Sequence, residues 1–250
     1  MPAKPFLTAR WVNLIIVSYH APESFLAPHL PAGLELDLID GEPTLSLVAF
    51  QFLDTRVWGV RWPGFVNFPE WNLRFYVREK ATKARGVVFI REFVPSVITS
   101  FFAKKIYNEP YEPAGFTHEM TREAGSISVR YTVHVDGREH TLRATAFDEL
   151  TVPEEHTAAH MLKEQQWGYG RTRGRGRGET LKYEVTHPRW RVFSHAACDV
   201  DVDWGALYGP KWAAMQGAKP FSVVLAEGSE VRVFGARAVT GPERSEGSRG

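Results

Sequence analysis

Residues 68–78 have the sequence FPEWNLRFYVR, in which polar and apolar side chains alternate. In a β-strand, this period of two gives a polar face and an apolar face: Glu70, Asn72, Arg74, Tyr76 and Arg78 on one, and Trp71, Leu73, Phe75 and Val77 on the other. If the polar face meets solvent, this is an ordinary amphipathic strand. If it points inward, Glu70 and Arg74 must pair, because an isolated buried charge is costly. The apolar face also requires burial, which favours the inward orientation.

Strand patterns flank this stretch on both sides. Residues 12–19 and 44–52 are predicted strands before it, and residues 86–94 follow it after a basic turn. Residues 34–39 alternate with period two and lead through Asp40-Gly41 into residues 44–52, which predicts a hairpin. Between 58 and 69, Gly and Pro recur among aromatics, so an irregular loop is expected there.

The remainder of the chain continues the strand-rich pattern. Further strands are predicted at 116–122, 126–135, 140–150, 180–186, 189–195, 221–225 and 230–234, with a tight hairpin at Asp136-Gly137. Short helices are predicted after Pro22 and over 96–107, 153–166 and 203–216, and a Gly/Arg loop over 168–178. Ten or more strands with few helices predict a mainly-β fold, in which one large antiparallel sheet curls or closes to hide its edges. We expect a single domain over residues 1–239 and a flexible polar tail over 240–250.

Composition excludes several classes of protein. The chain has 250 residues and a formal net charge of +1, so no global field attracts nucleic acid or an anionic membrane. No run approaches the roughly 18 apolar residues of a membrane span, and the first residues lack the apolar core of a signal peptide. With Cys198 alone, an internal disulfide and a zinc–thiolate cluster are excluded. We expect a cytoplasmic globular protein with no cofactor, nucleic-acid or membrane partner.

Several segments along the chain carry a family resemblance. They are Trp11, Tyr19, LPAGLELD (30–37), SLVAF (46–50), EWNLRFYV (70–77), GVVF (86–89), NEPY (108–111), WGY (167–169) and HPRW (187–190). On these segments the chain resembles the YqjF-like family of uncharacterised conserved proteins, which shares the acetoacetate decarboxylase-like fold. The resemblance implies an antiparallel β-barrel with a central pocket and a few short helices covering its openings.

The resemblance also bears on chemistry. A glutamate on the corresponding strand of acetoacetate decarboxylases lines the pocket, and Glu70 looks like its counterpart. Those enzymes carry a Pro-Lys-Lys motif whose first lysine forms a Schiff base, whereas the similar place here has Pro110-Tyr111-Glu112. Lys104 and Lys105 precede the proline on a predicted helix, where we expect them to be solvated. Without a nucleophilic amine that route has no electron sink, so we do not expect Schiff-base decarboxylation.

The leading functional prediction is binding of a small organic molecule, a carboxylate or a carbonyl compound, in the barrel interior. We expect Glu70 and Arg74 to be the polar anchors. Asn72, Tyr76 and Tyr111 are expected to orient the ligand, and Trp71 and Trp58 to form the apolar wall. An alternative is a lyase or hydrolase in which Glu70 is the general acid/base and Arg74 holds the anion of the substrate. Whether the protein is an enzyme at all, and whether it forms a homo-oligomer, stays open.

Three further motifs permit other functions. His156 and His160 have the i, i+4 spacing that can bind a metal, but no third ligand is evident, so we expect structural or solvated histidines. The Gly/Arg tract at 168–178 permits RNA binding as a minor alternative, and a basic hairpin loop is the expectation. His187 is expected to cap or pack at a strand start, with a place in the pocket as the alternative.

Overall fold

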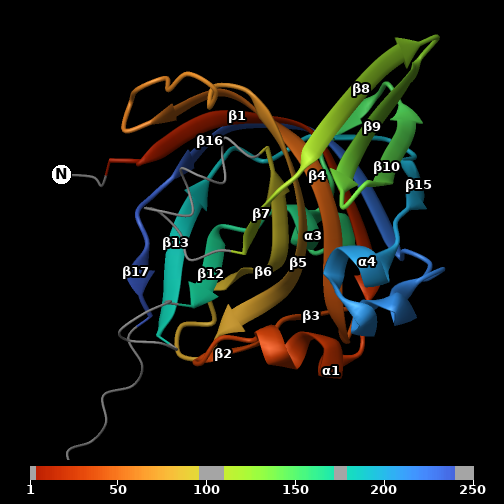
Figure 1. The fold of residues 1–250 in the computed structure, drawn as a ribbon. Coiled ribbons are helices and arrows are strands. Elements are labelled where there is room, and N and C mark those ends of the chain that lie inside the picture. The colour runs from red at the N-terminus through yellow and green to blue at the C-terminus, as the bar shows by residue number, and fades with distance from the viewer. Residues whose placement is uncertain (1–3, 96–109, 172–178, 240–250) are drawn as a thin grey trace, which may run out of the picture.

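The computed structural model describes residues 4–95, 110–171 and 179–239, and its strands form a ring (Figure 1). Seven strands of the larger sheet make this ring: β16 (Ser222–Val233), β1 (Leu7–His20), β4 (Glu42–Val57), β5 (Phe68–Glu79), β6 (Arg85–Val94), β12 (Trp167–Arg171) and β13 (Thr180–Thr186). The ring closes because β13 pairs with β16 through Val185–Val233 and Thr186–Arg232. The β6–β12 pair is parallel and the other ring pairs are antiparallel. The predicted mainly-β, barrel-like fold is confirmed.

Shorter elements surround the ring. Six strands extend the larger sheet: β2 (Leu34–Leu36), β3 (Leu38–Ile39), β7 (Tyr111–Pro113), β11 (Leu150–Thr151), β14 (Val192–Phe193) and β17 (Arg237–Ala238). A second sheet contains β8 (Gly115–Glu123), β9 (Ser126–Val135), β10 (Arg138–Phe147) and β15 (Ala197–Asp201). The α-helices of the described residues are α1 (Glu23–Leu26), α3 (Ala158–Lys163) and α4 (Trp204–Tyr208). None of them has the length and apolar character that crossing a bilayer requires.

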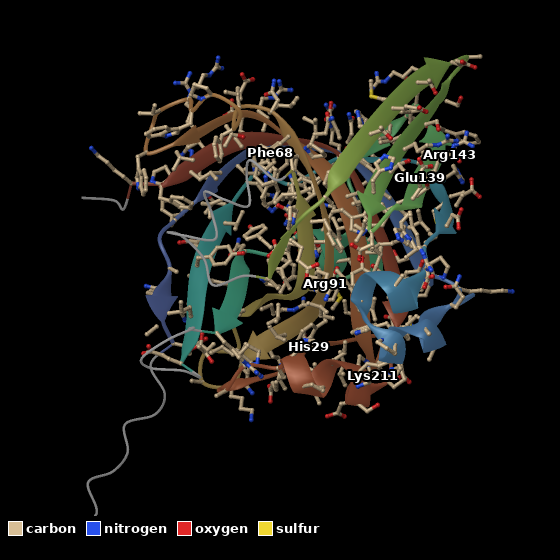
Figure 2. The ribbon with its side chains drawn as sticks, viewed as in Figure 1. His29, Phe68, Arg91, Glu139, Arg143 and Lys211 are labelled. Atoms are coloured by element: carbon tan, nitrogen blue, oxygen red, sulfur yellow. The ribbon has the colours of Figure 1, made fainter. Side chains whose placement is uncertain are left out.

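Strand β5 separates two hydrophobic cores because both of its faces are buried. Its odd-numbered side chains, from Trp71 to Val77, pack in the core that also includes the inner face of the smaller sheet and α4. There, Trp71 Nε1 donates a hydrogen bond to Tyr208 Oη at 2.9 Å. Its even-numbered side chains from Phe68 to Arg74 face the interior of the ring, where the second core includes Phe50 and Trp190. Figure 2 shows Phe68 on the ring, apart from Arg143 on the smaller sheet.

Helix α3 packs against the ring interior at one end of the polar row of β5. Its first turn is capped by Thr157 Oγ1, which accepts a hydrogen bond from His160 N at 3.3 Å. Leu162 packs with Tyr76, Val87 and other buried apolar side chains. This helix is shorter than the predicted 153–166, because the chain before Thr157 is a turn.

Two further predictions about local structure are confirmed only in part. The hairpin between 34–39 and 44–52 is limited to the pairs Leu38–Pro43 and Ile39–Glu42, because β2 instead pairs with β5. The predicted strands at 221–225 and 230–234 form one strand, β16, that continues through Gly228 at a φ of 85°. A Cβ at Gly228 would collide with the backbone of Trp11, so only glycine lets β16 follow β1 here.

The last part of the chain also differs from expectation. Residues 168–171 of the predicted Gly/Arg loop are strand instead, because Trp167–Arg171 pair with β6 and β13 as strand β12. The strand predicted at 189–195 is reduced to Val192–Phe193, and the strand Ala197–Asp201 was not predicted. The predicted helix 203–216 divides into α4 and a 3₁₀ helix at Pro210–Met215. The predicted helix 96–107, the remainder of the Gly/Arg tract (172–178) and the tail 240–250 lie outside the described residues.

Candidate functional site

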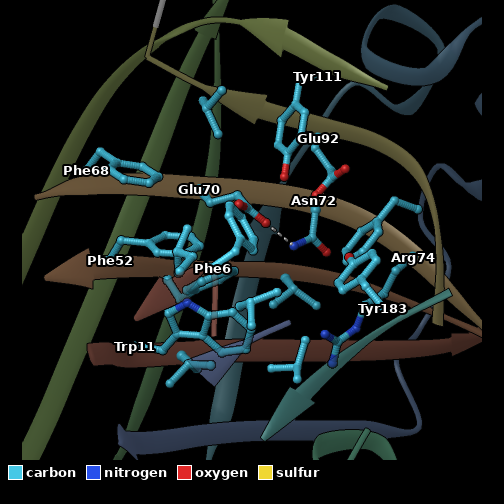
Figure 3. Close-up of a pocket in the computed structure, with 18 of the residues that line it drawn as sticks. Phe6, Trp11, Phe52, Phe68, Glu70, Asn72, Arg74, Glu92, Tyr111 and Tyr183 are labelled. Carbon is cyan, nitrogen blue, oxygen red and sulfur yellow. Dashed lines mark hydrogen bonds between the residues drawn. The ribbon is translucent and has the colours of Figure 1, made fainter. Parts of the chain in front are cut away.

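The ring encloses a cavity, shown in Figure 3, whose wall is mostly aromatic and aliphatic. The centre of a water-sized sphere can occupy about 80 Å³ of it. In this measure a single water needs roughly 10–15 Å³, so the cavity has room for several waters or a small organic molecule. Its described apolar lining comes from Phe6, Leu7, Trp11, Leu14, Val48, Phe50, Phe52, Phe68, Phe89, Val94, Val185, Trp190 and Val233.

A polar row crosses this apolar wall along β5. Glu70, Asn72 and Arg74 all line the cavity, and Glu92 stands opposite Asn72 on β6. Asn72 Nδ2 donates a hydrogen bond to Glu70 Oε1 at 2.9 Å. The two glutamates and the asparagine are at most 4% exposed. The cavity therefore presents two carboxyl groups, an amide and a guanidinium in a confined apolar space.

Arg74 lies at the end of the row beside α3. Its Nη2 donates to the backbone oxygen of Leu162 at 3.2 Å, and its guanidinium carbon is 5.9 Å from the ring centre of Tyr76. The predicted ion pair between Arg74 and Glu70 is wrong. Four residues of extended strand separate their backbones by about 13 Å, and Asn72 lies between them.

Some buried polar atoms in this wall have no hydrogen-bond partner among the described residues. They are Trp11 Nε1, Asn72 Oδ1 and Arg74 Nε. An unpaired buried polar group costs about 1–3 kcal/mol, and native proteins keep few of them. Because three of these atoms belong to one cavity wall, this wall has unused hydrogen-bonding capacity.

Two tyrosines complete the polar lining. Tyr111 comes from β7, which runs parallel to β6 beside Glu92, as the Glu92–Tyr111 register shows. Tyr183 comes from β13 and packs over Gly168 of β12. A Cβ on Gly168 would lie 2.5 Å from Cε1 of Tyr183, and closer still to Cζ, so this glycine makes room for the ring.

Three residues expected at the site lie elsewhere. Tyr76 is buried beyond Arg74, where its hydroxyl contacts Ser46 Oγ at 2.7 Å and the Leu162 oxygen at 3.2 Å. Trp71 belongs to the opposite face of β5. Trp58 is 59% exposed at a turn. The aromatic wall comes instead from β1, β4 and residues near β14, such as Trp190.

Behind the wall, a group of charged side chains supports Trp190. The carboxylate of Glu164 accepts hydrogen bonds from Lys163 Nζ and, at 3.2 Å, from Trp190 N. The His187 ring stacks on the Trp190 ring with centroids 4.2 Å apart. Burial lowers the pKa of His187, which favours the neutral imidazole. His187 therefore packs behind the cavity wall rather than in it.

Lysine and metal-ligand positions bear on the possible chemistry. The described residues that line the cavity include no lysine, and Lys104 and Lys105 lie outside the described residues. His156, at a φ of 68°, precedes α3, so it does not share a helix with His160. Within the described residues no group of three or more His, Cys, Asp or Glu side chains could hold a metal ion.

Comparison with known proteins gives both family and fold. The model of the family DUF2071, described as "Uncharacterized conserved protein", matches residues 8–230. The uncharacterized protein YqjF of Bacillus subtilis (strain 168) is 23% identical over 200 residues, which are 77% of each chain. Acetoacetate decarboxylase of Legionella pneumophila has a similar structure (TM-score 0.63, 15% identity, 96% of this chain and 88% of that one). So does the enduracididine biosynthesis enzyme MppR complexed with pyruvate (TM-score 0.62, 14% identity, 96% and 92%). Identities this low show a shared fold.

Proposed function

This chain belongs to the DUF2071 family and has the acetoacetate decarboxylase-like fold, and we propose that it binds a small organic acid or carbonyl compound inside its barrel. The observation that carries the proposal is the row Glu70–Asn72–Arg74 in the wall of an otherwise apolar cavity. Ligand pockets typically combine a mostly apolar lining with a few convergent polar groups. The enzyme MppR, which has a similar fold, forms a complex with pyruvate, a small keto acid.

Arg74 is the group that favours an acid. It is the positively charged member of the described lining, and one backbone oxygen takes up only part of its hydrogen-bonding capacity. Its Nε is buried and has no hydrogen-bond partner in the part of the chain that the structure describes. A carboxylate of the ligand would give the guanidinium a charge-assisted, bidentate partner.

The rest of the ligand meets two kinds of surface. Asn72 and Tyr111 orient its polar atoms, and Glu70 accepts a hydrogen bond from a ligand that carries a hydroxyl group. Trp11 and Phe50, whose ring centroids are 5.0 Å apart, pack against its apolar part. The small cavity limits this ligand to a few heavy atoms.

A second candidate is an enzyme that uses the same residues. Glu70 is 4% exposed and lies in the cavity, where a carboxyl group can transfer protons to a bound substrate as general acid/base. Arg74 then holds the anionic end of the substrate and stabilises charge that develops during the reaction. The reaction type is that of a lyase or a hydrolase, without a Schiff base.

Calorimetric titration with small keto acids, carboxylic acids and aldehydes tests the binding proposal. We expect acids to bind, and Arg74→Gln to weaken them by about 10–100-fold, the value of a hydrogen bond to a charged group. Arg143→Gln is the matched control, because Arg143 lies on the smaller sheet (Figure 2). Acids that bind equally well to Arg74→Gln, or a protein that binds none of the three classes, would contradict the proposal.

Glu70→Gln separates binding from catalysis. The amide keeps the shape of the side chain and removes its ability to transfer a proton. For a binding protein we expect acid affinity to remain within a few-fold of wild type. For an enzyme we expect substrate consumption, followed by NMR, to stop while binding persists.

Borohydride trapping with acetoacetate addresses the lysine route. We expect mass spectrometry to find no covalent adduct. A specific adduct at Lys104 or Lys105 would overturn our exclusion of Schiff-base chemistry.

A further inference from the structure

The loop between β4 and β5 exposes a cluster of large apolar side chains. Trp58, Val60 and Trp62 are 59%, 50% and 40% exposed, and we call them the aromatic tip. The loop extends from the ring at the upper left of Figure 1, where it is orange. Single exposed apolar residues are common, but two indoles on one loop form an unusual surface for a soluble protein.

The backbone holds Trp58 in an unfavourable conformation. Val57 and Val60 exchange two backbone hydrogen bonds of 3.0 and 3.1 Å, which closes a two-residue turn. Trp58 and Gly59 occupy this turn with φ values of 51° and 80°. Such turns favour Asn-Gly or Gly-Gly, and a bulky residue at positive φ is a true outlier. The fold therefore presents this indole to solvent at a conformational cost.

A groove lined by arginines lies next to the aromatic tip. In the strand register, Arg56 and Arg232 stand on either side of Thr8, one residue from the Val57 end of the strands. Arg10 lies two residues further along β1. Arg10, Arg56 and Arg232 are exposed, and none of them makes an ion pair among the described residues.

The groove has a net positive charge. Its lining contains these three arginines, Arg61, and the two acids Asp54 and Glu230, and its volume is about 390 Å³. Asp54 forms an ion pair with Arg61 at 2.5 Å. The three other arginines of the groove therefore face a single remaining carboxylate, that of Glu230. The groove therefore has a local excess of positive charge, although the formal net charge of the whole chain is only +1.

We infer that the aromatic tip and the arginine groove together bind the surface of an anionic phospholipid membrane. Indole rings prefer the boundary between head groups and acyl chains, and each arginine near an anionic surface adds attraction. Arg56 and Arg232 lie one residue, roughly 3.3 Å, from the end of the strands beside the tip, and Arg10 lies about three residues from that end. Arginines at that depth reach phosphate groups while the tip enters the apolar layer.

The alternative occupant, single-stranded nucleic acid, fits less well. Nucleic-acid surfaces use aromatic faces as stacking platforms along a basic groove. Here Val60 separates the two tryptophans in the sequence of this loop, and its aliphatic side chain cannot stack on a base.

The aromatic tip lies close to the cavity wall, because Trp58 N donates a hydrogen bond to the oxygen of Phe6, a lining residue, at 2.7 Å. The inference of membrane binding does not depend on which ligand the cavity binds.

Sedimentation with vesicles tests this inference. The full chain is mixed with vesicles of phosphatidylcholine alone or with about 30% phosphatidylglycerol, an anionic content that creates a strong surface potential. We expect pelleting only with the anionic vesicles, and weaker binding at high salt. Trp58→Ala/Trp62→Ala should abolish detectable pelleting. Arg10→Gln/Arg56→Gln/Arg232→Gln should weaken binding by about 100-fold.

Matched variants on the smaller sheet are the controls. Phe147→Ala removes another exposed aromatic side chain, and Arg122→Gln/Arg130→Gln/Arg143→Gln removes two exposed arginines and one half-buried arginine. These variants should pellet like wild type. Absence of pelleting, or equal loss in the control variants, would overturn the inference. The inference would also be overturned if millimolar inorganic phosphate displaced the protein from the vesicles while the tryptophan substitutions had no effect. It would be overturned as well if the same residues bound single-stranded RNA and not the vesicles.

Discussion

Replacing Gly168 by alanine tests how closely the cavity wall is packed. An added Cβ would lie 2.5 Å from Cε1 of Tyr183, whereas carbon atoms in contact prefer about 3.5–4.0 Å. The ring must therefore retreat by more than about 1 Å, and overpacking of this kind costs about 1–3 kcal/mol. Gly170, two residues further along the same strand, is the control because nothing lies within 4 Å of its Cβ position. Gly170→Ala should be neutral or stabilise the fold by about 0.4–1 kcal/mol.

A second variant removes the side chain of Tyr183, which the new Cβ would contact. Tyr183→Ala alone should cost several kcal/mol, because it empties a large buried side chain from the wall. In Gly168→Ala/Tyr183→Ala the new methyl group enters the vacated space, so the double variant should be about as stable as Tyr183→Ala. The double-mutant cycle then gives a favourable coupling energy of about 1–3 kcal/mol.

Urea unfolding, followed by tryptophan fluorescence, measures these free energies. Equal m-values across wild type and the four variants are needed, because a changed slope would mean a changed unfolded or native state. The reasoning is refuted if Gly168→Ala is as stable as Gly170→Ala, or if the two single losses simply add in the double variant.

Three further predictions concern stability. Tyr208→Phe leaves Trp71 Nε1 buried without its acceptor and should cost about 1–3 kcal/mol in urea unfolding; a neutral result would mean that the bond contributes nothing. Thr157→Ala removes the N-cap of α3 and should cost about 0.5–2 kcal/mol, with Thr157→Ser close to wild type. Burial gives His187 a lower pKa in the folded state than in the unfolded chain. The contribution of neutral His187 to the free energy of unfolding is therefore complete above the unfolded pKa. It is lost as the pH falls through and below that value, because the unfolded chain takes up the proton first. Unfolding free energy measured from pH 7.5 to 5 should therefore fall less steeply in His187→Gln, and an unchanged slope would contradict this.

Local periodicity predicted β5 well because that strand is regular over the polar row. It placed Glu70, Asn72 and Arg74 on one face, and these residues lie together in the cavity wall. The same method could not find Glu92. A β-bulge leaves Ile90 without an opposing residue, since Leu73 pairs with Arg91 and Arg74 with Phe89. The alternation of β6 therefore changes phase before Glu92, and no sequence pattern marks that change.

The remaining errors arise from contacts between distant parts of the chain. Arg74 meets Leu162, 88 residues away, and Trp71 meets Tyr208, 137 residues away. Periodicity assigns a side chain to a face but does not reveal what covers that face. Trp58 was expected in the wall because it is aromatic and near β5, whereas its backbone turn directs it to solvent. The predicted hairpin likewise ignored β5 as a competitor for β2.

The closure of the ring has a consequence for motion. β1 pairs with β16 along eleven residue pairs, whereas β13 meets β16 through only two. A cyclic arrangement of strands separates first at its weakest junction, and short ladders open at lower free energy than long ones. Phe234 N donates to the Glu184 oxygen across this junction at 2.9 Å. Deuterium should therefore enter the amide of Phe234 well before the amides in the middle of β1. Partial opening at this junction would widen the barrel while its other six junctions stay intact, and so provide a route by which molecules exchange with the interior.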